Sequence, residues 1–336
     1  MKASSTFLLS LLAALPCPLR ADNFEMLYKN TALLKAVPAA LAPVSAPAAL
    51  KSVVKNEVSY ENLVSAPVWR ASGAALVKTD IREGFGAARH QGRRNMCSVF
   101  AASSLVEYLV WEKTGEKPDF SEEFLFYSAK LKFTDNPELQ VYKTETGLAG
   151  YVAVDALRGG LVKETDWPFL PSLPAHTPVP PVLDADVALA PAGIYGKLLG
   201  HAFAPQAIRR GEIKDFLVNE RRPVVMNLML YMSNIDGKTG RISDPSEAQR
   251  KACFSAGTDC YGHVVLLTGY DPASGDFFFR NSWGASWGEA GYGRISGKYL
   301  MENCESCHYI SRLPSFDAGS RAMVVNSSYG WSATLK

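Results

Sequence analysis

Residues 91–113 read Gln-Gly-Arg-Arg-Asn-Met-Cys-Ser-Val-Phe-Ala-Ala-Ser-Ser-Leu-Val-Glu-Tyr-Leu-Val-Trp-Glu-Lys. From Val99 onward the apolar residues recur at steps of three and four, which predicts a nearly buried helix. Cys97 falls in its first turn, where unpaired N–H groups and the positive end of the helix dipole favour a thiolate. Such sites lower a cysteine pKa from about 8.5 to roughly 3.5–7.5. Cys97 is therefore a candidate nucleophile, and the alternative is a small buried thiol that only packs.

A second stretch predicts a β-hairpin. Two apolar, β-rich runs, residues 262–270 and 277–283, flank a cluster of turn residues. Folding the chain about residues 272–275 brings His263 beside Asn281. An amide oxygen that holds one imidazole nitrogen fixes the tautomer and orientation that a proton-shuttling base requires. The alternative for His263 is a satisfied histidine of the core.

Together these stretches resemble the papain-like cysteine peptidases. Over residues 80–312 the family's motifs occur in its order: Gln91-Gly92 before Cys97, Gly262-His263-Val264-Val265, Asn281-Ser-Trp-Gly284, and Trp287-Gly288-Glu289-x-Gly291-Tyr292. The resemblance implies an α+β, papain-like two-lobed fold, with a helical lobe, a β-barrel-like lobe and the active-site cleft between them. It also implies a cysteine-type endopeptidase.

The loop before Cys97 departs from the family pattern. The family's usual cysteine two or three positions before the nucleophile is absent, and Arg93-Arg94-Asn95-Met96 fills the loop. Ser98 stands where an aromatic residue commonly follows the nucleophile. The usual disulfide of this loop is therefore expected to be missing, and the chain resembles a divergent, bacterial-type member.

The resemblance gives each motif residue a role. Cys97 would attack a peptide carbonyl, His263 would move the proton, and Asn281 would orient the imidazole. The side-chain amide of Gln91 and the backbone N–H of Cys97 would donate to the oxyanion. Trp283 would cover the contact between His263 and Asn281.

Two glycines complete the site that the resemblance implies. Gly147 and Gly150 would form a cleft wall that an extended substrate backbone can approach, while the alternative is that they mark ordinary turns.

The ends of the chain predict a precursor. Residues 1–21 combine Lys2, a short apolar run and Ala21, a pattern typical of a signal peptide and too short to span a bilayer. Residues 22–75 are rich in alanine and proline and indicate a propeptide or linker. The catalytic domain is then expected over residues 76–315, followed by a C-terminal tail over residues 316–336. We expect a secreted or periplasmic protein.

Six cysteines fit an oxidising compartment. Cys17 is lost with the signal peptide and Cys97 stays unpaired, so Cys253, Cys260, Cys304 and Cys307 are expected to form structural disulfides of undetermined pairing. A redox pair or a zinc site at the C-x-x-C motif of residues 304–307 is the alternative. We expect no metal and no cofactor.

Composition and charge limit the partners. Lys and Arg total 35 against 33 for Asp and Glu, which gives a net charge of +2 and no argument for nucleic acid. A peptide or protein substrate is expected, with a proteinaceous inhibitor as a further partner, no stable membrane insertion and a monomeric state. Two alternatives stay open: a catalytically silent papain-like binding protein, and a deamidase or acyl transferase with the same triad.

Overall fold

The computed structural model describes residues 19–20, 77–131, 147–177, 185–199, 203, 205–256 and 259–311. The predicted propeptide or linker and the predicted C-terminal tail lie outside the described residues, as does the predicted signal peptide apart from residues 19–20. Among the described residues, no helix is both long enough and apolar enough to cross a membrane.

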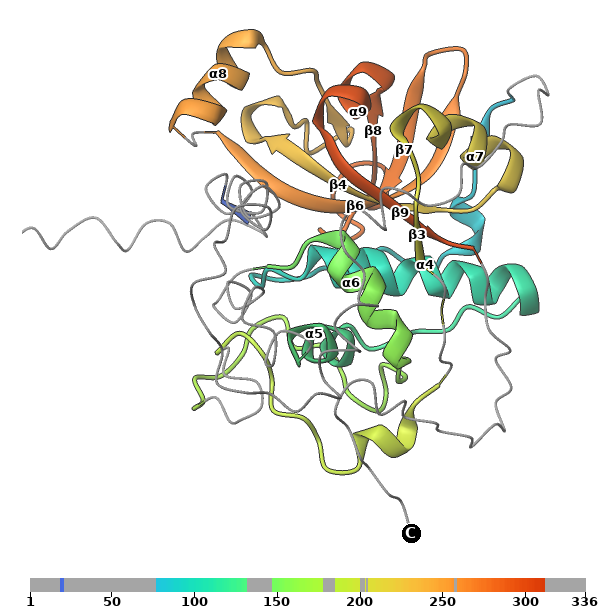
Figure 1. Cartoon of the computed structure of the whole chain (residues 1–336), viewed down its shortest axis with the longest axis vertical. Helices are drawn as coiled ribbons and strands as arrows, with labels where there is room; N and C mark the ends of the chain where they lie inside the picture. Colours follow the sequence, from blue (N-terminus) through green and yellow to red (C-terminus); the bar gives the residue numbers. More distant parts are fainter. Residues whose placement is uncertain are drawn as a thin grey trace, which may run out of the picture.

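Among the described residues, helices form one lobe and a sheet forms the other (Figure 1). The helical half contains α4 (Cys97–Thr114), α5 (Glu122–Leu131) and α6 (Gly150–Ala156). The strands are β1 (Leu19–Arg20), β2 (Thr79–Asp80), β3 (Pro205–Ala207), β4 (Val224–Tyr231), β5 (Arg241–Ile242), β6 (Cys260–Asp271), β7 (Asp276–Arg280), β8 (Tyr292–Ser296) and β9 (Cys304–Ile310). On the sheet side lie α7 (Ile213–Glu220), α8 (Glu247–Ala256) and α9 (Gly297–Asn303). Short 3-10 turns span Arg82–Gly84, Leu157–Gly159, Ile194–Lys197, Arg210–Glu212 and Met232–Asn234.

Helix α4 is the central element of the helical lobe. It begins at Cys97 and ends before Gly115, whose left-handed conformation (φ 77°) caps it. Every residue from Cys97 to Val110 is buried, because α5 and α6 pack on one side and β6 on the other. The predicted helix is therefore confirmed, and its lack of a polar face explains why it is buried on all sides.

The sheet follows the order β3-β9-β4-β6-β7-β8-β5, with β1 and β2 both paired to β6. The predicted hairpin is confirmed as β6 and β7, which pair from Leu266 with Arg280 to Asp271 with Asp276. Gly275 in its turn has φ 73°, a conformation that favours glycine. Because β6 lies between β4 and β7, it carries His263 in the middle of the sheet.

Two hydrophobic cores lie on opposite faces of β4 and β6. Val225, Val264 and Leu266 pack against the helices α4 to α6. Their neighbours along the strands, such as Met226 and Val265, face the second core beneath α7 and α9. Because side chains alternate along a strand, these two strands join both lobes. The α+β, papain-like two-lobed arrangement expected from the sequence is confirmed.

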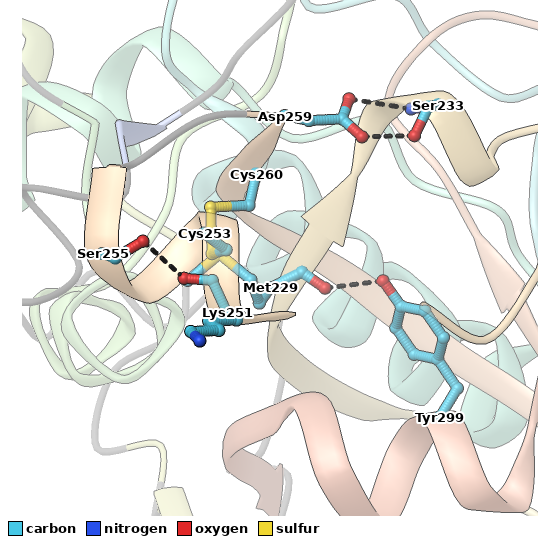
Figure 2. The surroundings of a disulfide bond; sticks show 8 residues. All are labelled: Met229, Ser233, Lys251, Cys253, Ser255, Asp259, Cys260 and Tyr299. Carbon is cyan, nitrogen blue, oxygen red and sulfur yellow. Dashed lines mark hydrogen bonds between the residues drawn. A yellow bond between two sulfur atoms is a disulfide. The ribbon is translucent and has the colours of Figure 1, made fainter. Parts of the chain in front are cut away.

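The predicted disulfides are confirmed only in part. Cys253 of α8 and Cys260 of β6 are bonded, with Cα atoms 5.6 Å apart. Figure 2 shows this bond between α8 and the sheet, with the Tyr299 hydroxyl donating to the Met229 carbonyl oxygen nearby at 2.6 Å. The disulfide therefore holds α8 to the start of the strand that carries His263.

The expectation of a second disulfide is wrong, because Cys304 and Cys307 are free thiols. Both lie in β9, whose pairing with β4 shifts register at this point, so that Cys307 lies opposite Met226 and Cys304 opposite Leu228. Both side chains are buried in the second core. Burial, together with the neighbouring Cys304 thiol, raises the pKa of the Cys307 thiol well above its usual value.

His308 gives the fold a pH-sensitive group. Its side chain is fully buried next to Tyr151, with ring centroids 6.2 Å apart. Burial lowers its pKa from 6.5 to about 4, against the opposing charge of Asp155. The imidazole is therefore neutral in the folded protein at pH 7.

His308→Gln is expected to make the protein more resistant to acid than the wild type. Unfolded His308 takes up a proton below pH 6.5 and folded His308 only near pH 4, so its stabilising contribution is lost as the pH falls through this window. Between pH 7 and 4.5 the wild type should lose about 2 kcal/mol relative to the variant. Urea unfolding at both pH values measures this difference. Equal acid sensitivity of the two proteins would show that His308 is not responsible.

Candidate active site

Cys97 occupies the first position of α4, after Met96 as the N-cap residue. Its side chain lines a pocket at the junction of the two lobes, together with Phe100, Ala101, Val264 and Asn281. The residue is 0% exposed, so its sulfur is covered in this structure. The helix start places the thiol where backbone N–H groups favour its charged form.

His263 and Asn281 meet as the hairpin geometry predicts. The Nε2 atom of His263 lies 2.9 Å from Oδ1 of Asn281. The backbone N–H of Ser282 donates to the same oxygen at 2.9 Å, which supports the orientation of the amide. Because an amide oxygen only accepts, Nε2 carries the hydrogen. Nδ1 is buried and has no hydrogen-bond partner among the described residues, so it is the nitrogen that remains for proton transfer.

Trp283 packs on the imidazole of His263, with ring centroids 4.9 Å apart and planes inclined by 34°. Trp287 meets Trp283 edge to face at 5.2 Å. This places Trp283 where its expected role requires, over the pair of His263 and Asn281. The indole of Trp283, with Trp287 packed edge to face against it, shields the hydrogen bond from water and thereby strengthens it.

Gln91 is fully buried and its side chain is held at both ends. Its Oε1 accepts from the Ser282 hydroxyl at 2.6 Å, and its Nε2 donates to the Arg94 carbonyl oxygen at 2.7 Å. Its backbone N–H donates to the Ser282 carbonyl oxygen at 2.8 Å. The loop before Cys97 is thus joined to the residue that follows Asn281, and the Gln91 amide has a single fixed orientation.

The two glycines lie at the start of α6. Gly147 is buried in the loop before this helix. The backbone N–H of Gly150 donates to Oδ1 of Asn227 in β4 at 2.5 Å, and a Cβ at Gly150 would meet the same oxygen. The Gly150 N–H is therefore held by Asn227 in this structure.

Three residues near these groups were given no role by the sequence motifs. Ser282 anchors Gln91, Asn227 contacts Gly150, and Arg94 carries the carbonyl that receives the Gln91 amide. Arg94 was visible as an unusual residue in the loop, but its partners lie far away in the sequence.

The described residues contain no group of three or more His, Cys, Asp or Glu that could hold a metal ion.

Comparisons with known proteins point to papain-like cysteine proteases. Residues 216–312, which include His263 and Asn281, match the family described as "Papain family cysteine protease". The crystal structure of Xylellain, a cysteine protease from Xylella fastidiosa, superimposes with a TM-score of 0.58 at 20% identity, over 75% of this chain and 93% of that one. Digestive procathepsin L 3 of Tenebrio molitor gives a TM-score of 0.53 at 18% identity, over 87% of this chain and 89% of that one.

Curated relatives match over short segments. "Gamete and mating-type specific protein A" of Dictyostelium discoideum is 44% identical over 54 residues, which cover 16% of this chain and 12% of that protein. A "Cathepsin L-like" protein of Caenorhabditis elegans is 60% identical over 37 residues, 10% and 11% of the two lengths. The chain thus spans about a tenth of the length of these relatives. The fold of the described residues is thus papain-like, and residues 216–312 of the sheet lobe match the papain family model.

Proposed function

We propose that the protein is a cysteine endopeptidase that hydrolyses peptide bonds through Cys97, His263 and Asn281. The observation that carries the proposal is the 2.9 Å contact between His263 and Asn281, beside the pocket that Asn281 shares with Cys97 at the start of α4. A thiol at a helix start and an imidazole oriented by an amide are the parts that nucleophilic catalysis by cysteine requires.

The reaction proceeds in two steps. The Cys97 thiolate attacks the carbonyl carbon, and protonated His263 gives its proton to the departing amine, which leaves a thioester. Water then attacks the thioester while neutral His263 accepts its proton, and the Cys97 sulfur departs with the acid product released. Gln91 and the backbone N–H of Cys97 donate to the oxyanion in both steps, and losing one such donor typically costs about 3–4 kcal/mol.

A peptide or protein is therefore the proposed substrate, and a proteinaceous inhibitor the proposed second partner of a monomeric enzyme. The protein is made as a secreted or periplasmic precursor, with residues 22–75 as its propeptide. The covered Cys97 and the likeness to a procathepsin support a precursor. Strand β1 pairs with β6 at Tyr261 and Gly262, next to His263. Because β1 lies within the predicted signal peptide, this pairing belongs to the uncleaved chain.

One experiment separates this function from its alternatives. Purified protein, with and without its first 75 residues, is incubated with a peptidyl thiol-reactive electrophile and with a mixed peptide library between pH 5 and 8. We expect labelling at Cys97 and cleavage within peptides, both increased by removal of residues 1–75. Labelling without any cleavage would favour the deamidase or acyl transferase, and neither result would favour a catalytically silent binding protein.

A further inference from the structure

We propose that Arg94 is a positioning residue for the peptidase reaction: it fixes the carbonyl that aims the Gln91 amide at the oxyanion. This inference rests on the proposed function, because it assigns Gln91 as an oxyanion donor. Arg94 itself contacts neither substrate nor the reacting atoms. It acts through its own main chain.

The Arg94 side chain is buried and fully paired. Its guanidinium forms a two-pronged contact with Glu123, which is 0% exposed, at 2.6 and 2.8 Å. The remaining N–H groups donate to the carbonyl oxygens of Leu170 at 2.9 Å and Asp186 at 2.6 Å, and to the Asp186 carboxylate at 3.2 Å. A planar fork that reaches five acceptors fixes the position of the residue that carries it.

Two aromatic rings, those of Phe126 and Phe169, also pack against the Arg94 guanidinium. Its central carbon lies 5.8 Å from the ring centroid of Phe126 in α5 and 5.7 Å from that of Phe169. Phe169 in turn packs edge to face on Phe100 of α4, at 5.0 Å. Arg94 therefore joins α5, the segment around residue 170 and the helix that begins at Cys97. A lysine would keep the charge but lose both the fork and the stacking.

The main chain of Arg94 transmits this fixed position to the site. Its carbonyl oxygen accepts from the Gln91 side chain at 2.7 Å and from the Met96 backbone N–H at 2.9 Å. The Gln91 Nε2 has two hydrogens, and the structure shows one acceptor for them among the described residues. With one hydrogen held by Arg94, the other has a defined direction and is available to a developing oxyanion.

The contacts of Arg94 lie in the loop before Cys97, in which the disulfide usual for papain-like peptidases is absent. Gly92 reinforces the loop from the other side: it has φ 64°, and a Cβ there would lie 2.2 Å from the Pro171 carbonyl oxygen. The Arg93 backbone N–H donates to that same oxygen at 3.3 Å. Buried ionic and backbone contacts thus give the loop the rigidity that a covalent bond would otherwise provide.

The test compares Arg94→Lys with Arg93→Lys in the full chain. Arg93 is the matched control, because it is the neighbouring residue of the same loop, its side chain is exposed, and no side-chain partner is found among the described residues. We expect Arg94→Lys to lower kcat by about 10- to 100-fold with KM within about threefold, since a displaced oxyanion donor affects the transition state alone. Affinity for a peptidyl aldehyde should fall by the same factor. Arg93→Lys should leave both within about twofold.

A double-mutant cycle and a measurement independent of activity complete the test. In a Gln91→Ala background, Arg94→Lys should lower kcat by no more than about threefold further, because the group it positions is gone. By NMR, hydrogen exchange of the Gln91 side-chain amide should be at least about tenfold faster in Arg94→Lys than in wild type. The inference would be overturned if Arg94→Lys lowered kcat by the same factor in the wild-type and Gln91→Ala backgrounds. An unchanged exchange rate of the Gln91 amide in a folded Arg94→Lys variant would overturn it as well. If wild type hydrolyses nothing, the proposed function fails, and the exchange measurement still decides the role of Arg94.

Discussion

Replacement of Cys97 by alanine is expected to abolish hydrolysis, with kcat/KM lower by at least about 10⁴-fold. Cys97 is the first residue of α4 and lines a pocket together with Asn281, the partner of His263. Removal of a triad nucleophile in other hydrolases lowers turnover by up to about 10⁶-fold. The measurement is a fluorogenic peptide assay with the protein lacking residues 1–75, with folding confirmed by circular dichroism.

Cys304→Ala is the matched control for this substitution. Cys304 is, like Cys97, a buried cysteine outside any disulfide, but it lies in the second core and away from the Cys97 pocket. Its removal should leave kcat/KM within about threefold and alter only stability. Retention of activity in Cys97→Ala, or an equal loss in Cys304→Ala, would show that Cys97 is not the nucleophile.

Glu123→Ala is expected to lower the free energy of unfolding by about 3–5 kcal/mol, because it leaves the buried Arg94 guanidinium without its two-pronged partner. Glu112→Ala is the control. Glu112 contacts Arg222 at 3.0 Å, and both side chains are about a third exposed. Its loss should cost less than about 1 kcal/mol, since exposed ion pairs are screened by solvent.

Urea unfolding at pH 7 measures both substitutions. Equal losses for Glu123→Ala and Glu112→Ala would mean that the Arg94 contacts contribute no more than a surface ion pair. In that case the rigidity of the loop before Cys97 would need another source.

The sequence was sufficient for the elements whose determinants are local. The apolar period after Val99 predicted α4, and the turn at residues 272–275 predicted the hairpin that joins His263 to Asn281. These predictions succeed because helix period and hairpin register are set by residues close together in the chain.

Contacts between segments that are distant along the chain could not be predicted from the sequence. Arg94 meets Glu123 and Asp186, which lie 29 and 92 residues further on, and nothing in the loop indicates those partners. The expectation that Cys304 and Cys307 take part in disulfides was wrong, because both are free thiols in β9 beside β4. The spacing of cysteines along the chain does not reveal that both belong to the core beneath α7 and α9.

The measurement that tests the central claim most directly is the rate at which iodoacetamide alkylates Cys97 between pH 5.5 and 8. Wild type and His263→Ala are compared after removal of residues 1–75, and mass spectrometry locates the modified residue. We predict that at pH 6 the wild-type Cys97 reacts at least about tenfold faster than Cys97 in His263→Ala, because the imidazolium stabilises the thiolate. Identical rates in the two proteins, rising with pH as for an ordinary thiol, would contradict the assignment of Cys97 and His263 as a catalytic pair.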